Sequence, residues 1–274
     1  MAGSLGFLIL GLPVLTSICE SAIVSPVSEF HRAAAAELFL PIDGSFGSLE
    51  DTYEALRTYD VLGIEKKSNV RPSASNGILK CELNNVAFEG IESRFKDSLK
   101  EANSLLDFYY SIGSLVLIKD ASGSDIHLED ADKVFRSVKT LSESDGRWRH
   151  SSNNPDSSND ATGAALEALA GAISLASSEI DQSLITTLKN DIIKLFDGIK
   201  RYDDGSCYFD EKIVDTHGHQ GPLSASASVV RGITTFAAVA SENLNLPGEK
   251  ILGLAKFFLG VGVPGSAKDL YLPN

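Results

Sequence analysis

The sequence predicts an all-α protein, a toroid-like α/α repeat array in which inner and outer helices alternate. Three observations support this class. A motif recurs at a fixed interval, apolar residues follow helical spacing along most of the chain, and clean apolar–polar alternation bounded by turns is almost absent. With 274 residues, the chain is long enough for a sizeable buried core.

The recurring motif defines the first two inner helices. Ser48–Leu56 reads SLEDTYEAL and Ser104–Ile112 reads SLLDFYYSI, so Ser, Leu, Asp and Tyr recur after 56 residues (104 minus 48). Each copy opens with Ser-x-x-Asp, in which the serine oxygen can accept a free N–H of the first helical turn. We therefore expect a capped inner helix at each copy.

Two later segments continue the series with smaller residues. In residues 160–176, Leu166 follows Tyr109 by 57 residues and Leu169 follows Ile112 by the same interval. The face of this segment is built from alanine and glycine. A fourth helix is expected over 222–240, where Pro222 suits the first turn. Small side chains on such a face let helices approach closely.

Amphipathic segments lie between the inner helices and predict the outer ones. Each carries one apolar stripe and one charged face, which is typical of a half-exposed helix. These stripes fall within residues 91–102, 134–141, 185–199 and 251–258. The result is about four inner–outer pairs with a period of 55 to 60 residues, compatible with a closed α/α toroid or an open α-solenoid.

The N-terminus predicts a secretory leader over residues 1–21. Leu5–Leu15 is an uncharged apolar run interrupted by Pro13, and small or polar residues follow it, as signal peptidase requires. The alternative, a buried helix, conflicts with the proline. We expect residues 22–274 to form the helical domain without a membrane span, since no other stretch approaches the ~20 apolar residues needed.

Composition limits the classes of partner. The net charge is −13 and the pI is about 4.8, which disfavours nucleic acids and anionic lipid surfaces because both require a basic face. Beyond the leader only Cys81 and Cys207 remain, so a disulfide scaffold is excluded; a single bridge between them is possible, but nothing in the sequence supports it.

One loop carries residue types that bind metals. Two interpretations of this segment are a zinc site and a polar connection without a metal. The spacing favours the polar connection, because His217 and His219 are too close together and only one cysteine is available. The set comprises Asp203, Asp204, Cys207, Asp210, His217 and His219. Trp148, in the Ser/Asn/Asp-rich segment 142–160, is either a partner contact or loop filler.

Nucleophile elbows and phosphate-binding loops are also missing, so we predict no catalytic, cofactor-binding or metal-binding residues. An enzyme of the toroid class, similar to prenyltransferases or terpene cyclases with a site near Cys207 and His217, stays as an alternative. A generic α-solenoid adaptor that binds peptides is the third hypothesis.

The motif Phe46–Leu56, ending at Leu62-Gly63, resembles the opening helical motif of the ribophorin II family. The leader, His31, the pattern at 205–209 and the small-residue helix after it extend the resemblance over about residues 28–260. The loops at 142–160 and 203–221 suggest a plant-like version.

This resemblance implies a non-catalytic subunit of the oligosaccharyltransferase of the endoplasmic reticulum, which transfers a glycan from dolichyl diphosphate to asparagine of nascent proteins. It implies a luminal location, the other oligosaccharyltransferase subunits as partners, and no cofactor. Family members continue into β-rich and transmembrane regions, so we expect this chain to represent the N-terminal luminal part.

Overall fold

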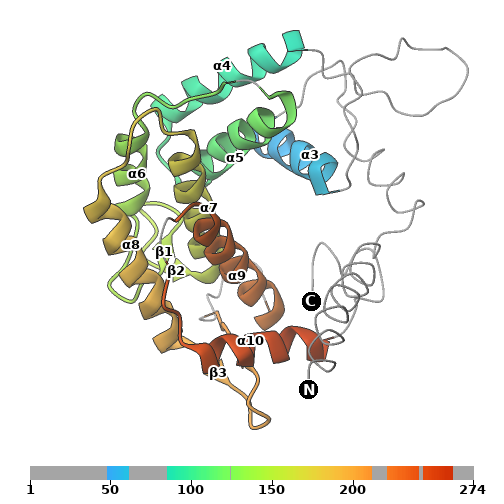
Figure 1. Cartoon of the computed structure of the whole chain (residues 1–274), viewed down its shortest axis with the longest axis vertical. Coiled ribbons are helices and arrows are strands. Elements are labelled where there is room, and N and C mark those ends of the chain that lie inside the picture. The colour runs from blue at the N-terminus through green and yellow to red at the C-terminus, as the bar shows by residue number, and fades with distance from the viewer. Residues whose placement is uncertain (1–47, 62–84, 124, 212–220, 241–242, 262–274) are drawn as a thin grey trace, which may run out of the picture.

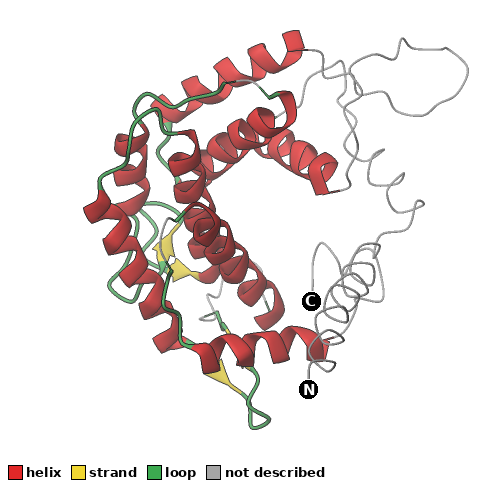
Figure 2. Ribbon diagram, viewed as in Figure 1, coloured by secondary structure: helices red, strands yellow, loops and turns green. Residues whose placement is uncertain are grey.

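The computed structural model describes residues 48–61, 85–123, 125–211, 221–240 and 243–261. This part of the chain is mostly α-helical (Figure 2), which confirms the all-α class. Its helices are α3 (Leu49–Val61), α4 (Asn85–Glu101), α5 (Leu105–Ser122), α6 (Ala131–Lys139), α7 (Asn159–Leu175), α8 (Gln182–Leu195), α9 (Pro222–Val239) and α10 (Gly248–Val261).

Four helices form an inner row, in which α3 packs on α5, α5 on α7 and α7 on α9. Figure 1 shows α4, α6, α8 and α10 along the outer edge of this row. Helices α4 and α6 pack against α5 and α7, respectively. All eight helices fall where the sequence predicts them, whereas closure of the row into a ring stays a prediction.

Serine caps begin three of the inner helices. The Asp51 N–H donates to Ser48 Oγ at 3.0 Å and the Ser48 N–H donates to Asp51 Oδ2 at 3.1 Å. The same reciprocal pair joins Ser104 and Asp107 at 3.2 and 3.0 Å. At α7, Ser158 Oγ accepts the N–H of Ala161 at 3.0 Å. The capping boxes predicted at Ser48 and Ser104 are therefore confirmed.

Glycines set the closest helix contacts. A Cβ at Gly232 would lie 2.7 Å from the carbonyl oxygen of Gly163, and one at Gly163 would clash with the backbone carbonyl of Ser228. A Cβ at Gly171 would lie 2.5 Å from Cγ2 of Ile112 on α5. These contacts confirm that the small-residue face of α7 lets α9 and α5 approach closely.

Two short hairpins, which the sequence analysis missed, interrupt the helices. Strand β1 (Trp148–Arg149) pairs antiparallel with β2 (Ser157–Ser158), and β3 (Lys200–Arg201) pairs with β4 (Cys207–Tyr208). With two residues per strand, neither shows a periodic pattern. Helix α8 ends at Leu195 and the 3₁₀ turn Phe196–Gly198 follows, so Ile199 lies beyond the helix that its spacing predicted.

Trp148 is neither a surface contact nor loop filler. Its side chain is fully buried, and its backbone N–H donates to Thr162 Oγ1 on α7 at 3.1 Å. Both hypotheses failed because the polar neighbours of Trp148 suggested exposure, whereas the β1–β2 hairpin turns the indole into the core. The segment 142–160 is thus packed onto α7 through this ring.

Several predictions concern residues outside the described part of the chain. These are the leader at 1–21, His31, Cys81, and the pair His217 and His219. Among the described helices, none is both long and apolar enough to cross a membrane.

Candidate functional site

A polar cluster draws its side chains from all four inner helices, and we call it the inner cluster: Tyr53 and Arg57 on α3, Tyr109 on α5, Glu167 on α7 and Arg231 on α9. Tyr53 donates its hydroxyl to Tyr109 at 2.9 Å, and Arg57 Nη1 donates to Tyr109 at 2.9 Å. Arg231 Nε donates to Glu167. The hydrogen bonds therefore connect α3 with α5, and α7 with α9.

Burial determines the protonation of the two tyrosines. Both side chains are less than one-tenth exposed, and burial raises the pKa of Tyr53 and of Tyr109. Their hydroxyls stay protonated at physiological pH, so they act as hydrogen-bond donors and acceptors. Their rings meet edge to face, with centroids 4.9 Å apart. This geometry holds helices together and keeps both tyrosines in an unreactive form.

Two of the five residues of this cluster belong to the recurring sequence motif. Tyr53 and Tyr109 are equivalent positions of the repeat, 56 residues apart, and they contact each other directly. Glu167 and Arg231 were missed because each lies in a helix of small apolar residues. A lone charge within such a helix was the available signal, since a partly buried charge requires a partner of opposite sign.

A second ionic group ties two outer helices together. Lys139 on α6 pairs with the buried carboxylate of Asp191 on α8 at 2.7 Å, and its ammonium lies 5.6 Å from the centroid of the Trp148 ring. Lys194 also pairs with Asp191, at 3.2 Å, so two cations neutralise the buried anion and one of them, Lys139, covers the indole. These side chains are all engaged with one another, which assigns the group a structural role.

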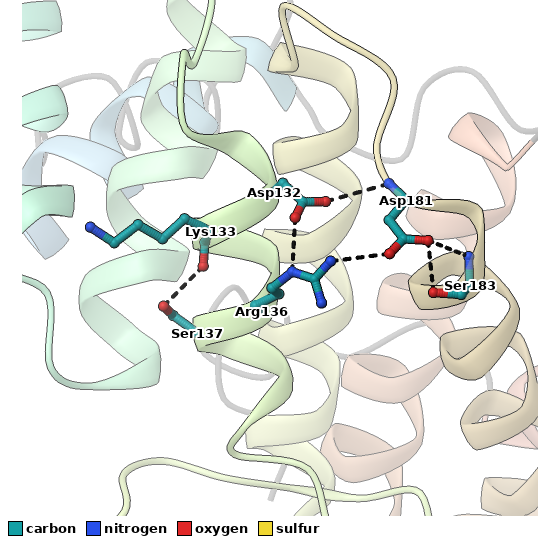
Figure 3. A network of polar contacts seen from close by, with 6 residues as sticks. All are labelled: Asp132, Lys133, Arg136, Ser137, Asp181 and Ser183. Carbon is teal, nitrogen blue, oxygen red and sulfur yellow. Dashed lines mark hydrogen bonds and ion pairs between the residues drawn. The ribbon is translucent and has the colours of Figure 1, made fainter.

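Figure 3 shows an exposed network that links α6 to the start of α8. Arg136 bridges Asp132 at 2.8 Å and Asp181 at 3.1 Å, while Ser183 donates its N–H to Asp181 at 2.9 Å. The hydrogen bonds from Ser183, and then Arg136, lower the pKa of Asp181. Asp181 is thereby kept ionised as the cap of α8.

The described start of the loop weighed as a metal site forms a tight turn. Asp204 Oδ1 accepts the N–H and hydroxyl of Ser206 at 2.9 and 2.7 Å, and Gly205 has the positive φ of 88° that this turn requires. Cys207 is buried against Gly253 of α10. Within the described residues, no three side chains of His, Cys, Asp or Glu gather in a way that could hold a metal ion.

A sequence model of the Ribophorin II N-terminal domain matches residues 72–272. The chain belongs to the ribophorin II family.

A curated relative from Oryza sativa subsp. japonica is named dolichyl-diphosphooligosaccharide–protein glycosyltransferase subunit 2. It is 52% identical over 276 aligned residues, which cover 92% of this chain and 39% of the relative. The chain therefore spans well under half the length of that protein. A search of solved structures gave no match.

The ribophorin II match covers α4 to α10, which includes an exposed apolar surface at the end of the array. On α10, Leu259 is 84% exposed, Leu252 is 72% exposed and Ile251 is 40% exposed. Beside it, Tyr202 and Tyr208 stack with their ring centroids 4.5 Å apart, and Phe257 stacks on Tyr208 at 5.8 Å. Leu259, Leu252 and Ile251 thus form a group of exposed large apolar side chains, which is typical of a surface that contacts another segment or protein.

Proposed function

We propose that this chain is the N-terminal luminal part of an oligosaccharyltransferase subunit in the endoplasmic reticulum, where it supports protein N-linked glycosylation without catalysing it. The observation that carries the proposal is the 52% identity, over 92% of this chain, with the rice protein named as subunit 2 of that transferase. In this role, the leader at 1–21 is removed and residues 22–274 form the helical domain.

The arrangement of polar side chains supports a docking role. The charged and hydroxyl groups of the inner cluster bind one another within two helix pairs, α3 with α5 and α7 with α9. The pKa values of its tyrosines are raised, which is the opposite of what an activated nucleophile needs. In this proposal, the chain presents helical surfaces to other subunits, and one of those subunits performs the glycan transfer.

Membership of a complex is tested with the natural full-length protein that carries this segment, tagged and purified from microsomes of its own source in mild detergent. We expect it to copurify with activity that transfers glycan from dolichyl diphosphate to an acceptor peptide containing Asn-x-Ser/Thr. An active complex that forms at full yield when this protein is depleted would contradict the proposal. Protease protection in sealed microsomes tests the luminal location.

A separate assay tests the non-catalytic role. The purified chain, given the same lipid-linked donor and acceptor peptide, is expected to transfer no glycan. Transfer by the isolated chain would overturn the non-catalytic part of the proposal, while the copurification result would still decide membership of the complex.

A finer proposal concerns the architecture. We infer that the four inner–outer pairs form part of a closed α/α toroid, because α3, α5, α7 and α9 contact one another in sequence order and the outer helices lie on one side of that row. An experimental structure of the chain would test this directly, and an open superhelix with separated ends would contradict it.

A further inference from the structure

One face of α10 carries an uncovered apolar stripe, which consists of Ile251, Leu252, Ala255 and Leu259. All four side chains are exposed, and their spacing places them on one side of the helix. The opposite side is occupied, because Gly253 contacts Cys207, Leu254 is buried and Phe257 stacks on Tyr208. Helix α10 is thus seated on the β3–β4 hairpin, and its other apolar face lacks a cover among the described residues.

The order of helices points to what covers the stripe. Inner helices α5, α7 and α9 are each preceded in the chain by an outer helix, namely α4, α6 and α8. Helix α3 is also an inner helix, so this order predicts an outer element before Ser48 in the chain. Figure 1 shows α3 and α10 at the two ends of the described array.

The residues before Ser48 have the composition that the stripe needs. From Ala33 to Leu40 the sequence is AAAAELFL, apolar at every position except Glu37. Pro41, Gly44 and Gly47 then separate this run from the cap of α3. We propose that residues 33–40 pack against the α10 stripe and join the two ends of the helical row.

The size of the stripe favours a segment of the same chain over a second copy. A stable interface between separate proteins buries about 800 Å² on each partner and involves roughly 20 residues a side, whereas this stripe has four side chains on one helix. A tethered segment avoids most of the entropy lost when two molecules associate. The net charge of −13 on each copy also opposes self-association.

Thiol labelling of the full chain tests the contact. In a background with Cys19→Ser and Cys81→Ser, which leaves the buried Cys207, two reporters are compared: Leu252→Cys on the stripe and Ser178→Cys on an exposed loop. If residues 33–40 cover the stripe, a maleimide labels the Leu252→Cys thiol at least about tenfold more slowly than the Ser178→Cys thiol.

Substitutions in the segment identify the cover. The pair Phe39→Asp and Leu40→Asp is expected to raise the Leu252→Cys labelling rate to that of Ser178→Cys. The matched pair Ser25→Asp and Ser28→Asp, which adds the same charge outside the apolar run, is expected to leave protection intact. Circular dichroism confirms that each variant is folded.

Three outcomes would overturn the inference: equal labelling of both reporters in the unaltered segment, protection that survives Phe39→Asp and Leu40→Asp, or protection that grows with protein concentration. The second indicates another cover, which Leu270→Asp and Leu272→Asp would test, and the third indicates a second copy. Because the isolated chain is used, failure here leaves the proposed membership of the transferase complex untouched.

Discussion

The α7–α9 contact and the α3–α5 contact occupy equivalent places in the helical row but are built from different side chains. Between α7 and α9, Gly163 and Gly232 bring the backbones so close that neither position has room for a Cβ. Between α3 and α5, Tyr53 and Tyr109 fill the space with rings joined through their hydroxyls. Gly113 contributes by making room, since a Cβ there would lie 2.5 Å from the Tyr53 ring.

The two contacts show that equivalent neighbours in the helical row can pack through different kinds of residue. A contact between backbones depends on the absence of side chains, and backbone atoms cannot move aside when one is added. A contact between tyrosines depends on two hydroxyls and on ring packing, and a ring without its hydroxyl keeps most of its packing. We therefore expect the α7–α9 contact to be the less tolerant of the two.

The largest effect should come from Gly163→Ala. The added Cβ clashes with the carbonyl of Ser228, so α7 and α9 must separate, and overpacking of this kind costs about 2–3 kcal/mol even after the helix gains from alanine. Urea unfolding followed by circular dichroism measures the loss.

Gly260→Ala is the matched control, because a Cβ at Gly260 on α10 meets no atom within 4 Å. It should leave the chain as stable as before or raise its stability by up to about 1 kcal/mol. Equal effects of the two alanines would show that the close approach of α7 and α9 contributes nothing specific.

Tyr109→Phe tests the α3–α5 contact and should lower stability by a moderate amount. It removes the acceptor of both Tyr53 and Arg57 while the ring stays in place, so a loss of about 1–2 kcal/mol is expected. Tyr53→Phe should cost less, because Arg57 still reaches Tyr109. Urea midpoints of the two variants give the order, and a greater loss for Tyr53→Phe would contradict the roles assigned here.

Ser104→Ala removes the serine cap of α5 and should lower stability somewhat less than Tyr109→Phe does. The Ser104 hydroxyl accepts the N–H of Asp107 at the start of the helix, and loss of such a cap costs about 1 kcal/mol. Ser48→Ala removes the equivalent but more exposed cap of α3, so its cost should be lower. If neither substitution moves the unfolding midpoint, the capping boxes recur without stabilising the array.

The comparison also explains which features could be predicted from the sequence. The caps, and the places of Tyr53 and Tyr109 on the apolar faces of their helices, follow from the recurrence at Ser48 and Ser104, because short-range spacing encodes them. The contact between the two tyrosines was not predicted. The close approach at Gly163 was expected from small residues alone. Pairing of Glu167 with Arg231, and burial of Trp148, depend on which helices and hairpins meet in space. Sequence spacing does not determine such contacts, so these residues were missed or misassigned.

The start of α7 differs from that of α5 in one respect that can be titrated. Glu211 accepts the N–H groups of Asn159 at 2.6 Å and of Asp160 at 3.2 Å, so a carboxylate from a distant loop helps to cap this helix. Burial raises the pKa of Glu211 above its ordinary value of 4.5, although the two N–H groups lower it. The folded chain therefore holds this proton to a higher pH than the unfolded chain does.

Glu211→Gln should consequently have the smallest effect, visible as a change in pH dependence. Because the pKa of Glu211 is higher in the folded chain than in the unfolded chain, protonation of Glu211 stabilises the folded chain. This stabilisation is complete below pH 4.5 and is lost as the pH rises through the pKa of the folded chain. The glutamine keeps an acceptor for both N–H groups but does not titrate, so its stability relative to the native chain should increase over that range and then level off. Urea midpoints between about pH 4 and about pH 7 measure this difference.

Asp210→Asn, which removes the same charge from the neighbouring exposed position, is the control. A difference between Glu211→Gln and the native chain that is constant with pH, or that falls as the pH rises, would show that burial of the Glu211 carboxylate does not govern its protonation and that α7 gains its cap without a cost in desolvation.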